Sequence, residues 1–507
     1  MAVTDMREEK LTKLKGLLAE ANYMDRAVRV LAWDRETYLP EGGAESRANQ
    51  LATLARMLHA ASTSDEIGRL LEDLTSEESD LDPDSDEARL LLVEKRDYEM
   101  ARKLPAELVE EVSRAGSEGL VAWHHAKEAK DYSLFVDALK RNAEVNRRVA
   151  DAYGYADRPY DAFVQIFESG MTTAQLDTIF SELKEAIVPL VREIASRKDA
   201  VDDSCLKQYY DEEKQLRFGL EIAERFGYDL KRGRLDQSAH PFTMPVAVGD
   251  VRITTRILPN QLDDGLLSTL HEAGHAMYEQ GVDPAFEGTP LSGGTSAGVH
   301  ESQSRLWENL VGRSRPFQDF LFPRLQSTFP DQLGKLDVEA FYRAINKVQP
   351  SLVRTAADEV TYNLHIMLRY ELENEMLEDK VDIGKLDTIW KERMEQYLGV
   401  VPQDDAEGVL QDIHWSTPGE YVFPGYTLGN MIGAQLFRRI RAEIPDLDGQ
   451  MASGEFGQLL EWLRSNVYHH GRKFTSNELM QRITGEPVGT AAWIAYARDK
   501  FSAIYGI

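Results

Sequence analysis

The sequence has very little cysteine and no long apolar run. Its single cysteine, Cys205, cannot form an intrachain disulfide or a thiolate metal site, so any metal must be held by histidines and carboxylates. No stretch of about 18 uninterrupted apolar residues occurs, so no membrane-spanning helix is expected. The first residues also lack the basic start, apolar core and cleavage site of a secretory signal. These absences predict a cytoplasmic protein with no membrane partner.

Positive charge is scarce relative to negative charge. The 507 residues include 58 lysines and arginines against 86 aspartates and glutamates, which gives a net charge of −28. A surface this acidic repels phosphate backbones and anionic lipid headgroups, so nucleic acid is not an expected partner. The hydrophobic fraction of 42% and the charged fraction of 28% are otherwise typical of a globular protein with a large core.

Helical periodicity dominates the chain. Apolar residues recur at three- and four-residue spacing, with charges between them, over 7–31, 88–152, 173–197, 212–226 and most of 303–400. In the last range, Ile345, Leu352, Ala356 and Val360 are expected to mark buried stripes. The acidic stretch 76–86 is expected to be an exposed loop between helices.

One region departs from the helical pattern. The segments 245–248 and 251–258 are rich in β-branched residues and flank a Gly-Asp pair, which predicts a small hairpin. No fixed-period repeat and no proline- or serine-rich linker is visible. The sequence therefore predicts a mainly α protein that folds as one domain over residues 1–507.

The segment 271–275, His-Glu-Ala-Gly-His, is the strongest local signal. On a helix, its two imidazoles lie on the same face and can bind one cation, while Glu272 projects beside it. Asp263 or Asp264 is expected to cap this helix, and Gly281 is placed to end it. Because such a pattern arises by chance in roughly a few per cent of chains of this composition, a third metal ligand is needed to support it.

The third ligand must be another histidine or a carboxylate, because a catalytic zinc usually takes three protein ligands and no thiol is available. Glu301 lies in a new helix expected to begin at His300, after enough chain for a loop and a return. It is the expected third ligand. Glu308, seven residues further on the same helical face, is its rival, and Glu279 and Glu287 are less well placed.

These residues together predict hydrolysis of a peptide or amide bond. A metal held by three such ligands lowers the pKa of a bound water and polarises a carbonyl, while Glu272 takes a proton and passes it to the leaving amine. No covalent intermediate is required. If the strand 251–258 runs beside the metal-binding helix, its edge could pair with an extended substrate, which favours a peptide over a small amide.

Two further segments carry candidate charges. In 408–415, Gln411 or Asp412 could orient neighbouring groups while His414 donates to developing negative charge, although a structural role is equally compatible with that histidine. Arg354 is expected to interrupt a helix with buried neighbours, so its guanidinium needs a carboxylate, from Asp358 or from a substrate.

The sequence resembles the carboxypeptidase Taq family, a group of HExxH metallocarboxypeptidases. The similarity covers nearly the whole chain. It includes the N-terminal Trp-Asp-Arg-Glu-Thr-Tyr-Leu-Pro-Glu-Gly-Gly, which begins at Trp33, and continues over residues 240–415. Six ordered motifs carry it there: His240–Phe242, Asp250–Thr254, His271–His275, His300–Gln303, Val353–Asp358 and Gly408–Trp415. The only departure from the family pattern is Val353 in place of isoleucine.

The resemblance implies an architecture. It suggests a large, mainly α body with a deep central groove and a small β-hairpin or sheet beside it, similar to neurolysin and angiotensin-converting enzyme. The N-terminal helices, about 1–170, would cover the groove, and the usual assembly would be a homodimer.

The resemblance also implies roles for the residues of the metal centre. His271, His275 and Glu301 would bind one divalent metal per chain, either zinc or cobalt, and Glu272 would be the general base. The implied activity is release of single residues from the free C-terminus of peptides, with broad preference.

Substrate-binding roles follow from the resemblance in the same way. Arg354 would hold the free α-carboxylate of the substrate, and His414 would stabilise the tetrahedral intermediate. His240, Arg252 and Tyr426 are further candidates for the site. An exopeptidase needs a cation about one residue beyond the metal, whereas an endopeptidase must leave that path open.

Two alternatives remain at this point. One is an oligoendopeptidase or a dipeptidyl carboxypeptidase on the same helical scaffold. The other is a non-catalytic helical protein in which the histidines and Glu301 hold a structural metal. Glu272 argues against the second alternative, because a closed structural site has no use for a free carboxylate beside the metal.

Overall fold

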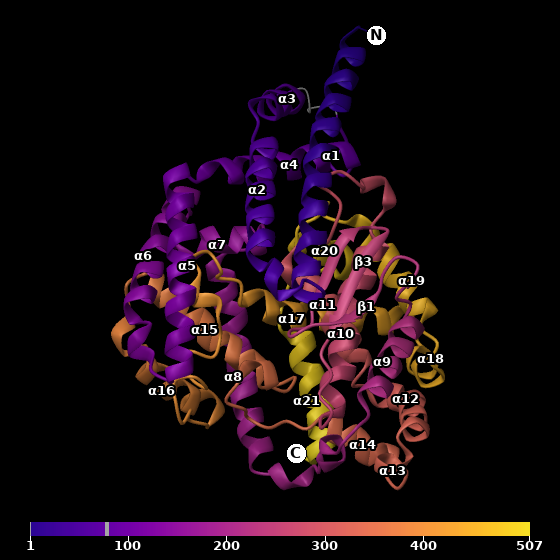
Figure 1. The fold of residues 1–507 in the computed structure, drawn as a ribbon. Coiled ribbons are helices and arrows are strands. Elements are labelled where there is room, and N and C mark those ends of the chain that lie inside the picture. Colours follow the sequence, from indigo (N-terminus) through magenta and orange to yellow (C-terminus); the bar gives the residue numbers. More distant parts are fainter. Residues whose placement is uncertain (1, 77–80) are drawn as a thin grey trace.

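The computed structural model describes residues 2–76 and 81–507, and helices make up most of it (Figure 1). The first part of the chain forms α1 (Ala2–Thr37), α2 (Ala44–Ser62), α3 (Asp65–Ser76), α4 (Asp86–Lys103), α5 (Ala106–Ala129), α6 (Val136–Tyr153), α7 (Tyr160–Phe167) and α8 (Thr173–Ala195). The middle part forms α9 (Glu212–Phe226), α10 (Leu262–Gly281), α11 (Ala297–Arg305), α12 (Arg315–Thr328), α13 (Pro330–Leu333), α14 (Val338–Ile345), α15 (Tyr362–Leu377) and α16 (Leu386–Leu398). The last part forms α17 (Pro424–Glu443), α18 (Leu447–Ser453), α19 (Gly457–Asn466), α20 (Ser476–Thr484) and α21 (Ala491–Tyr505).

Local capping explains several helix boundaries that the sequence predicts closely. Thr172 and Gln175 form a capping box at the start of α8. The side chain of Asp211 accepts from the backbone of Lys214 at the start of α9, and Gly227 ends that helix with a φ of 116°. The mainly α fold expected from the periodicity is confirmed.

The predicted helical region 303–400 is more broken than its periodicity suggests. α14 ends at Ile345, and α15 begins only at Tyr362. Pro350 explains the gap, because proline has no N–H and disfavours helical geometry in the residue before it. The expectation that these residues mark buried stripes is therefore wrong in part: Ile345 and Val360 are buried, whereas Leu352 is half-buried and Ala356 is exposed.

A three-stranded sheet contains the expected hairpin. β2 (Thr243–Ala247) pairs antiparallel with β3 (Asp250–Thr255) across the Gly-Asp turn, with a register shift between Pro245 and Ala247. A third strand, β1 (Leu235–Gln237), pairs in parallel with β3 and was not expected. β3 ends at Thr255 rather than Leu258, and it packs on α10.

The order of the strands corrects the prediction that the edge of β3 is free. β3 lies between β1 and β2, so both of its edges are already paired. β1 and β2 are the edge strands. On β2, the carbonyl of Pro245 accepts hydrogen bonds from Arg26 (2.9 Å) and Arg29 (3.2 Å) on α1. A peptide could therefore add to the sheet at β1 or β2 but not at β3.

Two apolar clusters form the interior. The larger one joins helices from α5 to α21, and the smaller one joins α1, α3 and α4 to the loop around Leu291. Figure 1 shows α1 to α4 gathered at one end of the molecule, above the sheet and α10. α3 ends and α4 begins at the limits of the predicted acidic loop, of which residues 77–80 lie outside the described part of the chain. None of the helices in the described ranges is both long and apolar enough to cross a membrane.

Candidate metal centre

α10 carries the two histidines of the HExxH segment on one face. Their ring centroids are 4.9 Å apart, as expected for residues one helical turn apart. α10 is buried on most sides and ends at Gly281 as predicted. The predicted aspartate cap is wrong, because Gln261 occupies the N-cap position and makes no side-chain cap bond. Asp264 instead pairs with Arg256 at 3.0 Å.

Two glycines allow α11 to lie close to the helices on either side of it. A Cβ atom on Gly274 of α10 would lie 2.7 Å from the backbone of Gln303 and Ser304 on α11. A Cβ atom on Gly429 of α17 would lie 2.5 Å from Cγ of Glu301 and 2.6 Å from its Cβ. Any larger residue at these positions must displace α11. The glycines therefore set how near Glu301 comes to the histidines of α10.

His271, His275 and Glu301 bring one possible metal-binding atom each to within 4.8 Å of one another. Oε2 of Glu301 lies 3.8 Å from Nε2 of His271 and 3.6 Å from Nε2 of His275. Ligands of a tetrahedral zinc are roughly 3.3 Å apart, so the three donors fit such an ion with only small adjustments. Two imidazoles and one carboxylate are also a donor set that zinc and cobalt both accept.

A second layer of polar groups holds each of these three side chains. Nδ1 of His271 lies 2.8 Å from Oε2 of Glu308, the residue weighed as a rival ligand. Glu308 therefore lies behind a histidine rather than beside the candidate metal position. Nε of Arg305 donates to Oε1 of Glu301 at 2.7 Å, which leaves Oε2 facing the histidines. Such partners fix the orientation and tautomer of metal-binding side chains.

His275 is backed by another imidazole. Its Nδ1 lies 2.6 Å from Nδ1 of His300, and Nε2 of His300 lies 2.8 Å from Oε1 of Glu279. Both hydrogen bonds form when Nε2 of His300 donates to Glu279 and Nδ1 of His275 donates to Nδ1 of His300. The lone pair on Nε2 of His275 is then free to bind a metal.

Burial and neighbouring charges set the protonation states of the three donors. Burial lowers the pKa of His275 to about 4, which favours the neutral imidazole that binds metals. For His271, burial acts in the same direction, but Glu301 and Glu308 together raise its pKa. Burial would raise the pKa of Glu301, but Arg305 and His271 hold it well below the usual range, so the carboxylate is ionised.

Glu272 lies beside the three donors without being one of them. Its Oε2 accepts from the hydroxyl of Thr243 on β2 at 2.6 Å, and the same hydroxyl lies 3.0 Å from the backbone carbonyl of Glu272. Burial, together with the charge of Glu301, raises the pKa of Glu272 despite the opposing effects of His271 and Thr243. A buried carboxylate with a raised pKa is suited to accept a proton during a reaction.

Arg354 does not interrupt a helix, contrary to the prediction. It lies in a short 3-10 turn, Arg354–Ala356, within the segment that Pro350 breaks. Its guanidinium is buried and donates to Oδ1 of Asp412 from Nε (3.0 Å) and Nη2 (2.8 Å). Asp358, the expected partner, instead accepts from the backbone at the start of α15.

Aromatic side chains connect Arg354 to the metal centre. Nη1 of Arg354 donates to the hydroxyl of Tyr362 at 3.0 Å, and the guanidinium of Arg305 lies 4.5 Å from the centre of the Tyr362 ring. The Tyr426 ring lies 5.5 Å from the Arg354 guanidinium, and the charges of both Arg354 and Glu301 affect the Tyr426 hydroxyl. Arg354 is therefore two side chains away from Glu301.

His414 lies on the Arg354 side of this group, in the turn His414–Ser416. Its ring packs 4.5 Å from the Phe423 ring, and its Nδ1 is buried without a hydrogen-bond partner in the described part of the chain. Burial lowers the pKa of His414 to about 4, with Arg354 and Arg369 acting in the same direction. At neutral pH this imidazole is uncharged, so it can donate a hydrogen bond but supplies no positive charge.

The structure does not bring His240 and Arg252 into the centre. His240 is exposed, three residues before Thr243. Arg252 pairs with Asp250 at 2.7 Å and stacks 4.5 Å from the Trp33 ring of α1. None of their contacts within the described ranges reaches the three metal donors.

Several residues that support the centre were not found from the sequence. Thr243 is a single hydroxyl in a short strand, and Arg305 and His300 carry no spacing signal of their own. Glu168 is fully buried and accepts from the backbone of Gly298 at 2.9 Å, at the start of α11. Its partner is 130 residues away in sequence, so local patterns give no sign of the contact.

Comparisons with known proteins agree with this geometry. Residues 13–501 match the model of a family described as Carboxypeptidase Taq (M32) metallopeptidase. Thermostable carboxypeptidase 1 of Thermus thermophilus is 41% identical over 498 residues, which cover 96% of this chain and 97% of that protein. Carboxypeptidase 1 of Bacillus subtilis is 37% identical over 489 residues, with coverage of 96% and 97%. The solved structure of an M32 carboxypeptidase from Deinococcus radiodurans R1 superposes with a TM-score of 0.95 at 42% identity, covering 98% of this chain and 100% of that one.

Proposed function

This chain belongs to the carboxypeptidase Taq (M32) metallopeptidase family, and on that premise we propose that it releases single residues from the free C-terminus of peptides with broad preference. The observation that carries the proposal is the convergence of His271, His275 and Glu301 beside a buried carboxylate, Glu272, that is not one of the three donors. A structural metal site needs no such carboxylate. This geometry therefore favours an enzyme over a metal-stabilised binding protein.

We propose that the three donors hold one divalent ion per chain, zinc or cobalt. Such an ion supplies a Lewis acid that polarises the scissile carbonyl and lowers the pKa of water. Glu272 accepts the proton of the attacking water and delivers it to the leaving amine, and Thr243 orients its carboxylate for both steps. His414 donates a hydrogen bond to the oxygen that becomes negatively charged.

Arg354 carries the proposal for an exopeptidase. A guanidinium has five N–H groups, and three of them donate to Asp412 and Tyr362, so two remain for the α-carboxylate of a substrate. Asp412 and Tyr362 also hold the guanidinium in a fixed orientation, which favours recognition of a planar carboxylate. The Tyr426 ring lies 5.5 Å from the Arg354 guanidinium, and in this proposal it lines the position of the C-terminal residue.

We propose only more distant contacts with the peptide chain for Arg252 and His240. His240 precedes β2, and Arg252 lies on β3 opposite Met244 of β2, the strand whose Thr243 contacts Glu272. The proposal also includes a cytoplasmic location, an assembly of two chains, and N-terminal helices that cover a groove over the centre. An oligoendopeptidase or dipeptidyl carboxypeptidase remains the competing activity on this scaffold.

Cleavage of a peptide with a free C-terminus, compared with its C-terminal amide, tests the proposal directly. We expect mass spectrometry to show stepwise loss of single residues from the free acid and strongly reduced cleavage of the amide. Phenanthroline should abolish the activity, and added zinc or cobalt should restore it. Internal cuts in both peptides would indicate the endopeptidase, and loss of residue pairs would indicate the dipeptidyl carboxypeptidase.

Two variants separate the roles of the residues. Glu272→Gln should retain the metal and the fold but lose activity by a factor of about 100 or more, because the proton acceptor is gone. Arg354→Gln should lose most of the preference for the free acid over the amide. Unchanged activity of Glu272→Gln with the metal bound would rule out the proposed general base.

A further inference from the structure

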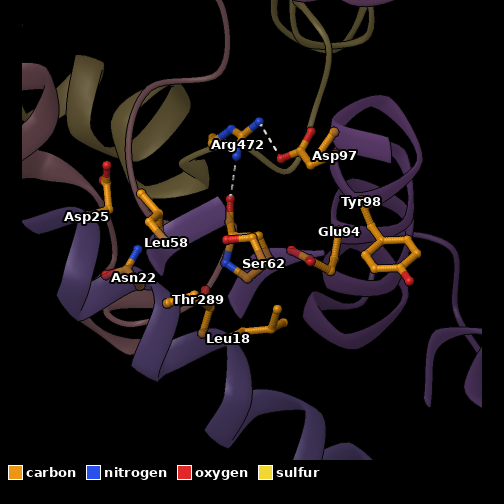
Figure 2. Close-up of a pocket in the computed structure, with 13 residues that line it drawn as sticks. Leu18, Asn22, Asp25, Leu58, Ser62, Glu94, Asp97, Tyr98, Thr289 and Arg472 are labelled. Carbon is orange, nitrogen blue, oxygen red and sulfur yellow. Dashed lines mark hydrogen bonds and ion pairs between the residues drawn. The ribbon is translucent and has the colours of Figure 1, made fainter. Parts of the chain in front are cut away.

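A cavity of about 310 Å³ lies among the N-terminal helices (Figure 2). Its walls come from α1, α2 and α4, together with the loop at Thr289–Pro290 and the side chain of Arg472. None of the three metal donors, and none of the residues assigned to the substrate, lines it. The cavity lies next to the smaller apolar cluster of the molecule, to which Leu18 and Tyr98 belong. It is thus separate from the site proposed above.

The wall of the cavity combines aliphatic side chains with an excess of acid. Leu18, Leu58 and Ala101 supply apolar surface. Four lining residues have ionisable acidic or basic side chains, and three of these are acidic, with Arg472 as the only base. A volume of this size is at the small end of the range for ligand pockets. The cavity therefore suits a small ligand with an apolar body and a positive charge.

Two of the three acids already have cationic partners. Asp25 on α1 pairs with Arg29 at 2.7 Å. Asp97 on α4 pairs with Arg472 at 2.8 Å and with Arg96 at 3.0 Å. Figure 2 shows the link between Asp97 and Arg472 as a dashed line. The charges of these two acids are therefore compensated within the protein.

Glu94 is the acid without a partner. Its side chain extends from α4 into the cavity (Figure 2), and only 8% of the residue is exposed. It has no hydrogen bond and no ion pair within the described residues. Burial raises the pKa of Glu94 to about 8, Asp97 adds to the effect, and Arg472 opposes it. An isolated buried carboxylate is costly unless a proton or a cation neutralises it.

We propose that this cavity binds a primary alkylammonium group, with the Glu94 carboxylate as its counter-ion and the aliphatic wall around its carbon chain. A primary ammonium has three N–H donors, and Ser62 and Asn22 line the same cavity as further acceptors. A metal ion does not fit, because within the described residues only the HExxH centre brings three His, Cys, Asp or Glu donors close together.

Calorimetric titration of the full-length protein with n-butylammonium tests the proposal, with n-butanol as the neutral analogue. The groups that face Glu94 are Asp25 from α1, Asp97 and Tyr98 from α4, and Arg472, whereas α2 contributes no charged residue. Binding of the cation should remove the proton from Glu94. Because the alkylammonium stays charged below about pH 10, the affinity should rise about tenfold per pH unit up to about pH 8 and then level off.

Proton release gives a second, independent readout of the same event. Titrations in buffers of different ionisation enthalpy should report release of about 0.9 proton per bound amine near pH 7, and about 0.1 near pH 9. Glu94→Gln mimics the protonated acid and should remove both the binding and the proton release. Glu99→Gln, which removes an exposed carboxylate from the same helix, should bind as the wild type does.

Some outcomes would overturn the proposal. These are no saturable binding of n-butylammonium to the wild type, equal binding of n-butanol, or unchanged binding by a folded Glu94→Gln variant. The alkylammonium group could belong to a lysine side chain of a peptide or to a free amine, and titration with N-acetyl-lysine amide distinguishes these two sources. Binding of both compounds would extend the site to lysine side chains of peptides, and binding of n-butylammonium alone would assign it to free amines.

Discussion

At the scale of single residues, the clearest case of a side chain held in an unusual state is Glu373 on α15. It is fully buried, 2.9 Å from Nε1 of Trp415 and 2.7 Å from the hydroxyl of Tyr160. Burial raises the pKa of Glu373 to about 8, although its two hydrogen-bond partners and Arg369 act against this. The carboxyl is therefore protonated at neutral pH. It holds Trp415, the residue that follows His414.

This state predicts a pH-dependent stability. The unfolded chain ionises Glu373 near pH 4.5, whereas the folded protein keeps the proton until about pH 8. As the pH rises between these two values, the free energy of unfolding falls by roughly 1.4 kcal/mol per pH unit. Glu373→Gln removes this effect, so its melting temperature relative to the wild type should rise steadily from about pH 5 to about pH 8.

The control for this measurement is Glu213→Gln, which removes an exposed carboxylate from α9. Its melting temperature should differ from that of the wild type by a similar small amount at each pH. A difference for Glu373→Gln that stays constant or falls as the pH rises would mean that Glu373 is ionised in the folded protein.

At the scale of secondary-structure elements, α11 determines the shape of the metal centre. α11 lies between α10 and α17, and glycines on both neighbours face it. Gly429→Ala would place a Cβ 2.5 Å from Cγ of Glu301 and 2.9 Å from its backbone carbonyl carbon. The backbone of α11 must then move, and Oε2 of Glu301 moves away from the histidines.

We therefore expect Gly429→Ala to weaken metal binding about 10- to 100-fold, as changes behind metal ligands typically do. Competition of the apo protein with a fluorescent chelator for zinc measures this without reference to activity. Gly433→Ala is the matched control, because its Cβ would meet the carbonyl of Ser302 at 3.2 Å and no metal donor. Equal zinc affinity of a folded Gly429→Ala variant and the wild type would contradict this account of α11.

The sequence predicts those elements whose cause is local. The periodicity of α8 and α9, and the hairpin of β2 and β3, depend on neighbouring residues, so these elements appear nearly where expected. β1 has only three residues, too few for a strand pattern. The break after Ile345 follows from Pro350 and was missed because the apolar spacing continues through it.

The residues of the candidate centre show the same difference between local causes, which the sequence reveals, and long-range contacts, which it does not. The two histidines of α10 and Glu301 lie in short motifs, which made them predictable as a group. Arg354 was expected to pair either with Asp358, one turn away on a helix, or with a substrate, but the segment is not helical. Its partner Asp412 lies 58 residues away and is brought close only by the fold.

At the scale of the whole molecule, the imbalance of charge should control the response to salt. With 86 acids against 58 bases, many acids must lack a basic partner even though exposed ion pairs are numerous. Exposed pairs contribute about 0–1 kcal/mol each, whereas a net charge of −28 repels itself throughout the folded surface. Salt weakens both effects, and the repulsion is the larger one.

Raising sodium chloride from about 0.05 M to about 0.5 M should therefore raise the melting temperature by several degrees near pH 7.5. Near pH 5 the net charge is close to zero, since the pI is about 4.9, and the same salt change should give no increase. Potassium chloride should act as sodium chloride does, because screening depends on ionic strength and not on the ion. A fall in melting temperature near pH 7.5 would mean that attraction within the ion pairs outweighs the repulsion of the excess acids.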